Sequence, residues 1–337
     1  MSCVAVVSFL TLALTIIDPN INRAVFSVAP AQTAIVTTSE GLPATASLLF
    51  VGDIMLSRGI GNIMHKREDV DYPFALITEQ IRTADLAFAN LESPISDRGT
   101  NMGSIYSFRA DPQAVQGLKN ADFDVVSTAN NHAWDYGGDA YTDTLALLDS
   151  VGIGHAGGGM DHAGAHTPVI RTVNGTRFAF LGYTNLIPRG VTTVDAHPAV
   201  AFLDIEAVKQ DIAAAKQAAD VVIVSYHWGE EYKTAHNAWQ EDIAHQTIDA
   251  GAALVIGHHP HVVEEVEQYH GGYIAYSLGN FVFDQNFSAD THHGLMLSVV
   301  FENGAVKTVT PTMVDFTDTF QPYVNESLSA PTIIEVS

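Results

Sequence analysis

The sequence predicts an α/β protein, and composition, length and patterning all support this class. The chain has 337 residues, of which 47% are hydrophobic and 16% charged, as is typical of a globular protein with a large core. From Ser47 onward, short apolar runs alternate with segments of helical periodicity, which indicates alternating strands and helices. The length suits one large domain or two ordinary ones.

Seven apolar runs have the length and composition of strands. The first is Leu48–Asp53, a continuous apolar stretch that ends in an aspartate. The others are Leu86–Glu92, Asp124–His132, Phe178–Asn185, Val221–Glu231, Ala253–His261 and Tyr273–Asp284.

Two helices between these runs are predicted from their ends and their periodicity. In the segment 204–219, Asp204 is an N-cap residue, and an apolar stripe begins at Ile205 and recurs at helical spacing. The segment 238–251 closes with Gly251, at the position where a helix prefers glycine.

The remaining parts of the chain are expected to lie outside this domain, which we place at 47–316. Residues 1–17 contain an apolar run of signal-peptide length, shorter than the ~20 residues of a membrane span, and are expected to be a signal or membrane anchor. The run lacks the basic residues that usually precede a signal sequence. It could instead be a buried helix, or the start codon could be misplaced so that the basic residues were trimmed. Residues 18–46 are rich in Ala, Thr, Ser and Pro and are expected to be a linker, and 317–337 a C-terminal tail.

The charge of the chain argues against a nucleic-acid partner, and its cysteine content excludes an internal disulfide. The formal net charge is −23 and the chain contains no basic cluster, so a nucleic-acid partner is not expected. The single cysteine, Cys3, excludes an internal disulfide. The acidic balance is explained by colloidal solubility, by carboxylates that hold cations, or by both.

Polar side chains follow six of the seven predicted strands. They include Asp53, Glu92 and His227, and the histidines of the segment 258–261 form the densest group. Because ligands of open α/β sheets bind at the carboxyl ends of strands, we expect these side chains to share one site. Imidazole, carboxylate and amide groups together suit divalent ions such as Mn, Zn, Fe or Ca. The number of groups is enough for one ion or for two about 3.5–4 Å apart, bridged by a carboxylate.

Each group alone also has an ordinary structural explanation. Asp53 could simply end a strand, Asn131 and His132 could form a turn, and His227 could be a hydrogen-bonded core histidine. The cluster of His258, His259 and His261 is less easily explained in this way, and the whole series favours a metal site. The histidines that do not follow a strand are expected to be surface or packing residues: His65, His155, His162, His166, His197, His236, His245, His270, His292 and His293.

Other catalytic patterns are absent from the sequence. It contains no Gly-x-Ser-x-Gly motif, and Cys3 is badly placed for a nucleophile. The glycine-rich segment 154–164 lacks the Lys-Ser/Thr that would follow in a P-loop, so a tight turn between a helix and a strand is expected there.

Taken in order, the motifs of the chain resemble those of the bacterial capsule-synthesis CapA (PgsA-like) family, which is similar to the calcineurin-like metallophosphoesterases. The resemblance covers about residues 47–316. It implies a metallophosphoesterase-like sandwich of two mixed β-sheets flanked by helices, and a role in making, anchoring or processing a poly-γ-glutamate-type capsule outside the cytoplasm. The motifs are LLFVGDIMLSRGI, FANLESPIS, YSFRADP, VVSTANNHAWDYG, SYHWGEEY, GHHPHVVE and YSLGNFVFDQ.

The resemblance also implies roles for individual residues. Asp53 and His261 would ligate a first ion, and Glu92 would bridge it to a second. His227 and His259 would ligate the second ion, and Asn131 would supply an amide oxygen. His132 would be the catalytic residue, a proton donor or charge stabiliser beside the ions. The expected substrate-binding residues are Arg58, Asn90 and Asn280.

The chain departs from the metallophosphoesterase pattern at two positions. Met55 stands where an Asp-x-His motif has its histidine, and Glu92 stands where an aspartate is usual. The loss of an imidazole weakens one metal position, so phosphoesterase activity is not implied by the resemblance.

Three functions remain open on this sequence. The first is an extracytoplasmic metal-binding component of capsule or poly-γ-glutamate synthesis, membrane-associated through its N-terminal segment or secreted. The second is a free-standing metal-dependent hydrolase of phosphoester or peptide-like bonds, and the third is a non-catalytic scaffold of a membrane synthase complex. The expected partners are an anionic capsule polymer or its precursor, and membrane synthase subunits. Since an acidic surface repels such a polymer, we expect it to be engaged at the metal pocket.

Overall fold

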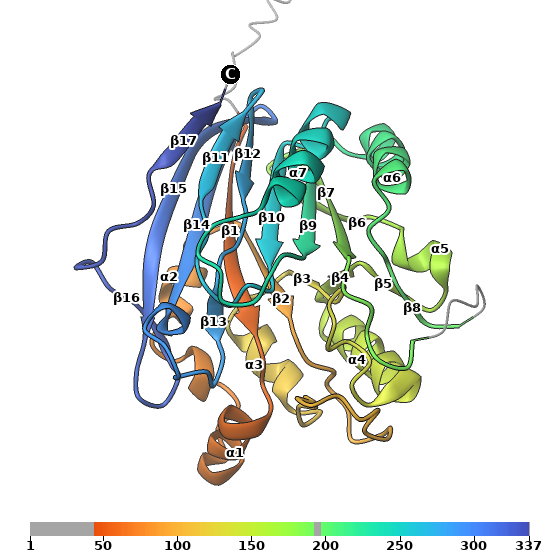
Figure 1. Cartoon of the computed structure of the whole chain (residues 1–337), viewed down its shortest axis with the longest axis vertical. Coiled ribbons are helices and arrows are strands. Elements are labelled where there is room, and N and C mark those ends of the chain that lie inside the picture. The colour runs from red at the N-terminus through yellow and green to blue at the C-terminus, as the bar shows by residue number, and fades with distance from the viewer. Residues whose placement is uncertain (1–43, 192–196, 337) are drawn as a thin grey trace, which may run out of the picture. The chain divides into compact units, whose positions relative to one another are not determined.

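The computed structural model of the chain describes residues 44–191 and 197–336. Over these residues the protein builds two mixed β-sheets that pack face to face, with helices on their outer sides (Figure 1). This confirms the predicted α/β sandwich. The segment expected to be a signal or anchor, 1–17, and residues 18–43 of the expected linker lie outside the described residues. The expected linker, 18–46, ends too late, because Thr45 and Ala46 already belong to the first strand, β1 (Thr45–Ile54). Within the part of the chain that is described, no helix has both the length and the hydropathy needed to cross a membrane.

The first sheet joins parallel strands at one side to antiparallel strands at the other. In spatial order its strands are β16 (Pro322–Val324), β15 (Ala305–Phe316), β14 (His293–Glu302), β1 (Thr45–Ile54), β2 (Leu86–Leu91), β3 (Val125–Ser127) and β4 (Gly154–Ala156), with β13 (Asn280–Val282) paired to the end of β1.

The second sheet has a parallel centre with an antiparallel pair on each flank. Its strands are β17 (Ile333–Val336), β11 (Val266–Tyr269), β12 (Gly272–Ala275), β10 (Leu254–His258), β9 (Val221–His227), β7 (Thr176–Thr184) and β6 (Val169–Val173). A separate small pair consists of β5 (Gly158–Gly159) and β8 (Ala199–Val200).

Helix ends follow the capping residues of the sequence. Asp204 accepts a hydrogen bond from the Glu206 amide, and Gly251 adopts a left-handed φ of 110°, which confirms both predicted helices. The helices are α1 (Arg58–Arg67), α2 (Thr78–Ile81), α3 (Ala114–Asn120), α4 (Gly137–Val151), α5 (His162–Ala165), α6 (Ile205–Ala218) and α7 (Ala238–Ala250), with 3₁₀ helices η1 (Tyr72–Phe74) and η2 (Asp290–His292).

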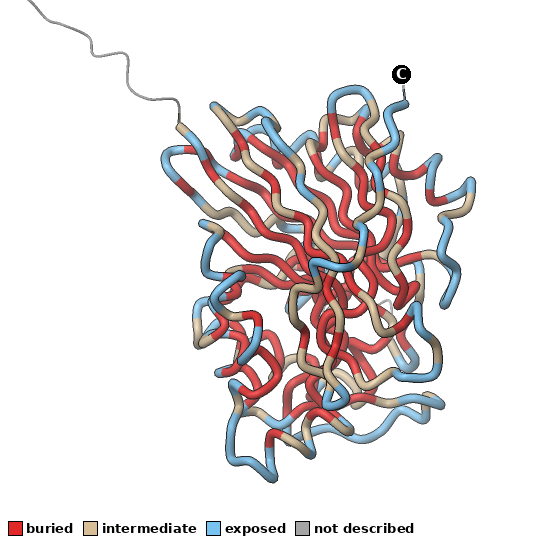
Figure 2. Tube along the Cα trace, turned by 90° about the vertical axis from the view of Figure 1, so that its left-hand side faces the viewer, coloured by how far each residue is buried: buried red, intermediate tan, exposed pale blue. Residues whose placement is uncertain are grey.

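Strand alternation divides the core into layers. In β1, Leu48 and Phe50 face the second sheet, whereas Leu49 and Val51 face the helices. The Phe88 ring of β2 stacks on the Phe180 ring of β7 across the sandwich, with centroids 5.7 Å apart. Burial of a phenylalanine side chain stabilises a fold by roughly 1.5–3 kcal/mol, so this contact helps to hold the two sheets together. Figure 2 shows buried strands through the interior and exposed segments mainly in the loops.

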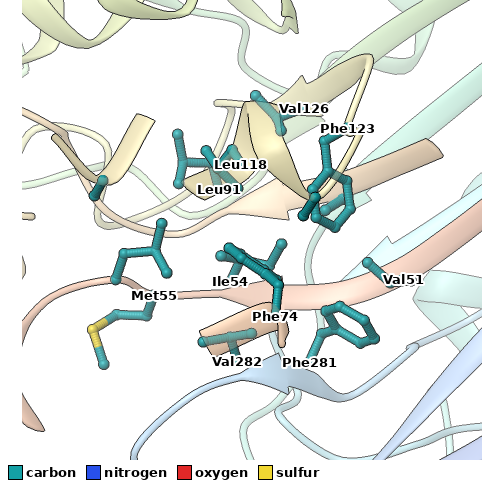
Figure 3. Packing of buried hydrophobic residues seen from close by; sticks show 14 of the residues in the cluster. Val51, Ile54, Met55, Phe74, Leu91, Leu118, Phe123, Val126, Phe281 and Val282 are labelled. Carbon is teal, nitrogen blue, oxygen red and sulfur yellow. The ribbon is translucent and has the colours of Figure 1, made fainter. Parts of the chain in front are cut away.

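Each sheet also packs against its own helices. On the first sheet, Val51 and Ile54 share a cluster with Phe74, Leu118 and Phe123, which come from η1, α3 and the loop before β3 (Figure 3). On the second sheet, α6 and α7 cover the outer face of β9 and β10. Helices therefore flank both sheets.

Two further segments differ from the sequence-based expectation. The residues expected to be a tail, 317–337, contribute β16 to the first sheet and β17 to the second. The glycine-rich segment 154–164 contains β4 and β5, with Gly157 at a φ of 77° between them. A Cβ at Gly157 would lie 2.5 Å from the Gly182 carbonyl oxygen, so this strand turn requires glycine.

The carboxyl ends of the parallel strands meet between the two sheets. β1, β2 and β3 run parallel in the first sheet, and β9 and β10 run parallel in the second. In their registers Asp53 faces Asn90 and His227 faces His258. Polar side chains that end strands of different sheets are thus brought to one place.

Candidate metal centre

Asp53 lies where the carboxyl ends of the parallel strands meet, between two asparagines. Asn90 and Asn280 stand beside it in the registers of β2 and β13. The Asn90 amide nitrogen donates to Asp53 Oδ1 at 2.9 Å, and the His259 backbone N–H donates to Oδ2 at 3.3 Å. His261 Nδ1 lies 3.4 Å from the same Oδ2. All of these side chains are buried, so the aspartate is held rigidly.

The histidine segment after β10 has a strained backbone. His259 has a φ of 100° and His261 a φ of 58°, conformations that non-glycine residues rarely adopt. Pro260 separates them, and both imidazoles turn back into the protein, where they are 5% and 2% exposed. Strain of this kind, which costs of order 1–3 kcal/mol per residue, is typical of functional sites.

Glu92 has a carboxylate oxygen that its neighbours leave unpaired. Its side chain is fully buried, and Oε1 has no hydrogen-bond partner among the described residues. Three imidazole nitrogens surround this oxygen beyond hydrogen-bonding distance: Nε2 of His261 at 3.5 Å, Nε2 of His132 at 3.8 Å and Nε2 of His227 at 4.0 Å. Ligands about 2.1 Å from one ion lie roughly 3–4 Å apart. The spacing therefore fits a divalent ion between Glu92 and the imidazoles of His227 and His261, with His132 beside it.

Neighbouring groups fix the orientation of two imidazoles. His261 Nδ1 lies 3.0 Å from Asn280 Oδ1, so an N–H on Nδ1 would donate to this oxygen and leave the Nε2 lone pair facing Glu92. His227 Nε2 lies 2.8 Å from Asn131 Oδ1, and its Nδ1 lies 3.3 Å from the Asn90 amide nitrogen. Orienting contacts of this kind are usual around metal ligands.

The pKa values of the cluster favour its ligand forms. Burial opposes the charge of Asp53, but His258 and His261 outweigh it and hold the pKa of Asp53 well below its ordinary value. Burial lowers the pKa of His227, and it lowers that of His259 to about 3. Both imidazoles are therefore neutral, as metal ligation requires.

The pKa of Glu92, in contrast, is shifted toward its protonated form. Burial, together with repulsion from Asp53, raises the pKa of Glu92 well above its ordinary value. A cation beside Glu92 would reverse this, since positive charge favours the ionised carboxylate.

His132 is oriented by a carboxylate of its own. Its Nδ1 lies 2.7 Å from Asp135 Oδ2, which also accepts the Phe108 amide at 2.8 Å. The Phe108 ring packs against the imidazole, with centroids 4.1 Å apart. This places Nε2 toward Glu92, as a proton donor beside an ion would need.

The expected substrate-binding residues differ in exposure. Arg58 is partly exposed, pairs with Asp284 at 2.8 Å and covers the Phe108 ring. Asn90 and Asn280 are fully buried, and their amides are engaged with protein groups. The role of Asn90 and Asn280 in substrate binding stays a prediction. In the structure both amides contact candidate metal ligands, as residues that orient such ligands do.

Two residues of the centre were not among the predicted ligands. His258 Nδ1 lies 3.2 Å from Asp53 Oδ1. Glu231, which is exposed, comes together with His259 and His261, so that one ligand atom of each lies within 4.8 Å of the others; Asp53, Glu92 and His261 form a second such group. The pair Glu230-Glu231 after a strand was a signal for this position, but the sequence alone did not indicate which carboxylate turns inward.

Three of the remaining histidines pair with carboxylates that do not belong to the centre. His245 pairs with Glu267 and His166 with Asp211, both at 2.7 Å, and His155 lies 3.3 Å from Asp149. Met55, at the position of the missing imidazole, is buried with its sulfur accepting from the Ser57 amide and hydroxyl.

Comparisons with known sequences find close relatives. A family model described as bacterial capsule synthesis protein PGA_cap matches residues 47–285. "PGA biosynthesis protein CapA" of Bacillus subtilis (strain 168) is 34% identical over 293 residues, which covers 86% of this chain and 76% of the relative. "Capsule biosynthesis protein CapA" of Bacillus anthracis is 32% identical over 280 residues, with 79% and 66% covered. "Probable polyglutamine synthesis accessory protein Rv0574c" of Mycobacterium tuberculosis (strain ATCC 25618 / H37Rv) is 29% identical over 288 residues, with 72% and 76% covered.

Solved structures of low sequence identity are also similar. The 5'-nucleotidase precursor from Thermus thermophilus matches with a TM-score of 0.48 at 11% identity, over 85% of this chain and 56% of that one. The NAD nucleotidase (NadN) of Haemophilus influenzae matches with a TM-score of 0.46 at 12% identity, over 87% and 57%. The chain thus spans little more than half the length of either enzyme.

Proposed function

The chain belongs to the bacterial capsule synthesis protein PGA_cap family, and we propose that it serves capsule synthesis as an extracytoplasmic metal-binding protein. The single observation that carries the metal centre is the unpaired, buried Glu92 Oε1 with imidazole nitrogens of His132, His227 and His261 at 3.5–4.0 Å. A buried carboxylate without a partner is costly, and a cation would remove this cost.

The residues that would hold the metal form two overlapping sets. Asp53, Glu92 and His261 would hold one ion, as their ligand atoms lie within 4.8 Å of one another. Glu92, with Asn131, His227 and His259, would hold a second. When bound, one or two divalent ions would supply a local positive charge that attracts anions and polarises a carbonyl or phosphoryl oxygen.

The substrate we propose is an anionic capsule polymer of the poly-γ-glutamate type, or its precursor. Relatives named for PGA and capsule biosynthesis support this class. The formal net charge of −23 would repel a polyanion along an extended surface. The polymer is therefore engaged at the metal centre, where the sign of the charge is reversed, with Arg58 at its edge as a further cation.

The extracytoplasmic location rests on the N-terminal sequence. The apolar run Val4–Ile17 has the length of a signal peptide, and a capsule polymer is assembled for the cell exterior. Cell fractionation of the 337-residue chain, compared with a chain lacking residues 1–17, tests it. Loss of the protein from the membrane and external fractions on truncation supports the proposal, and an unchanged cytosolic distribution of both chains contradicts it.

A metal-dependent hydrolase is a second candidate function. The observation that favours it is the His132–Asp135 pair, whose Nδ1–Oδ2 distance of 2.7 Å turns Nε2 toward Glu92. In this arrangement Asp135 orients the imidazole, and Nε2 can give a proton to a leaving group. The bond cleaved would be a phosphoester or a peptide-like bond.

Polymer binding tests the first function directly. Variants D53A and H261A should lose poly-γ-glutamate in a pull-down in Mn²⁺ buffer, because each loses a ligand that no neighbour replaces. The controls are D318A and H65A, which remove an exposed aspartate and an exposed histidine outside the centre. Undiminished binding by D53A and H261A contradicts polymer engagement at the metal centre.

A further inference from the structure

Glu231 is an exposed carboxylate that lies beside two buried imidazoles. One carboxylate oxygen of Glu231 and one nitrogen each of His259 and His261 lie within 4.8 Å of one another. We infer that Glu231 is a further metal ligand, which closes a cation position with His259 and His261 on the solvent side of the centre. The inference rests on the proposed metal centre and adds to it a residue from another loop.

The backbone holds Glu231 at this position. The Tyr232 amide, next to it in the chain, donates to the Pro260 carbonyl at 2.8 Å. The Trp228 amide donates to the His258 carbonyl at 3.1 Å. The loop after β9 thus runs along the histidine segment, and Glu231 is held over it although its side chain is exposed.

The neighbouring ring supports the same placement. Tyr232 has a left-handed φ of 65°, and its ring lies nearly parallel to that of His261, with centroids 6.2 Å apart. The Tyr232 ring is also perpendicular to the ring of Phe287, with centroids 4.8 Å apart. Tyr232 is restrained by its backbone hydrogen bond and by its ring contacts. These contacts also restrain the backbone of Glu231, the residue before it.

His259 contributes a buried nitrogen that is available to a metal ion. His259 is 5% exposed, and its Nδ1 has no hydrogen-bond partner among the described residues. A buried, neutral imidazole nitrogen without a partner is a ready ligand. Glu231 is the carboxylate that groups with His259 and His261 as possible ligands of one ion.

Met55, which follows β1 two residues after Asp53, is not available as a ligand of the first ion. Met55 offers no nitrogen there, and its sulfur accepts from Ser57. Asp53 and Glu92 already bring carboxylates to His261, and Glu231 adds a third. A cation beside these carboxylates would offset the repulsion between them.

Glu230 provides a matched control. It is adjacent in the chain and exposed, but it lines a different cavity of about 330 Å³ together with Lys233, Asn237 and Gln240. Glu230 does not belong to either group of ligands. E230Q and E231Q therefore make the same chemical change at neighbouring positions.

Calorimetric titration of the chelator-stripped protein with Mn²⁺ tests the inference. E231Q should lose one bound ion or weaken one binding step at least about tenfold, the lower end of what even an outer-shell partner contributes. E230Q should match the unchanged chain, and E231D should retain more affinity than E231Q. Equal thermal melting of E231Q and the unchanged chain in chelator would show that the fold is intact.

The outcomes separate the inference from the proposed function. If the unchanged chain binds Mn²⁺ and E231Q binds it with the same stoichiometry and affinity, the role of Glu231 is overturned while the metal centre stands. If the unchanged chain binds neither Mn²⁺ nor Zn²⁺, both are overturned.

Discussion

His261 Nε2 lies 3.5 Å from Glu92 Oε1, although the two residues follow strands of different sheets. Glu92 comes directly after β2, and His261 comes after β10. The contact can form only if the sandwich is assembled, so a ligand bound between these residues would bind the folded chain and not the unfolded one. Metal binding and folding should therefore be linked.

Replacement of Glu92 should have opposite effects with and without metal. In chelator, E92Q should stabilise the protein at neutral pH by at least about 1 kcal/mol, because its neutral amide avoids the burial of an unpaired charge. With Mn²⁺ in excess, the unchanged chain should gain stability and E92Q should gain much less. Urea unfolding followed by circular dichroism measures both.

The pH dependence of the same variant follows from the raised pKa of Glu92. The folded chain keeps this proton to higher pH than the unfolded chain, so stability is complete below about pH 4.5 and is lost as the pH rises through the folded pKa. The decline in chelator should be smaller in E92Q. Parallel pH profiles for the two chains contradict the burial of an unpaired charge.

Substitution of Asn90 or Asn280 distinguishes orientation of ligands from contact with substrate. Both amides contact groups of the centre, so N90A and N280A should weaken Mn²⁺ binding about 10- to 100-fold. N62A, on the exposed side of α1, is the control. Unchanged metal affinity with weakened polymer binding would favour the substrate-contact role instead.

His132 separates the hydrolase from the accessory role. If the protein cleaves a chromogenic phosphoester, H132A should lose turnover by about 10²–10⁴-fold. Its metal content, measured by plasma mass spectrometry, should not change. D135N should lose less, because the imidazole remains. Full turnover in H132A excludes the proton-donor role, and metal binding without turnover in the unchanged chain supports the accessory role.

Glu264 predicts a second pH effect, away from the metal centre. Its Oε2 accepts from the Gln240 amide at 3.1 Å, and burial raises its pKa to about 8. Stability from this group is full below about pH 4.5 and is lost between that pH and about 8, at about 1.4 kcal/mol per unit of pKa difference. E264Q should flatten the urea-unfolding profile over this range. The control E326Q, at an exposed position, should not, and an unchanged slope in E264Q would show that Glu264 is ionised in the fold.

Much of the fold could be predicted because its central strands are apolar on both faces. Leu48–Asp53 and Val221–His227 read as continuous apolar runs, since each packs between a second sheet and a layer of helices. The hairpin of β14 and β15 was not identified, although Asn303 and Gly304, with φ values of 54° and 80°, form the expected tight turn. β17 could not be predicted, because four residues carry no periodic signal and pair only with a distant strand.

Part of the candidate metal centre could also be predicted from the positions of the strands. Parallel strands carry their carboxyl-end residues to one edge, so Asp53 and His227 were expected to meet there. Glu231 was missed because it belongs to a loop whose position depends on the hydrogen bond from Tyr232 to Pro260. Asn90 and Asn280 were expected at the centre, but only the register beside Asp53 reveals that their amides face its ligands.

The most direct measurement is anomalous diffraction from crystals grown with Mn²⁺. The proposed centre requires a manganese peak within about 2.0–2.3 Å of ligand atoms of Asp53, Glu92 and His261, with occupancy lost in D53A. A crystal grown with saturating Mn²⁺ that shows no peak between these three side chains, or shows peaks only at surface carboxylates, would contradict it.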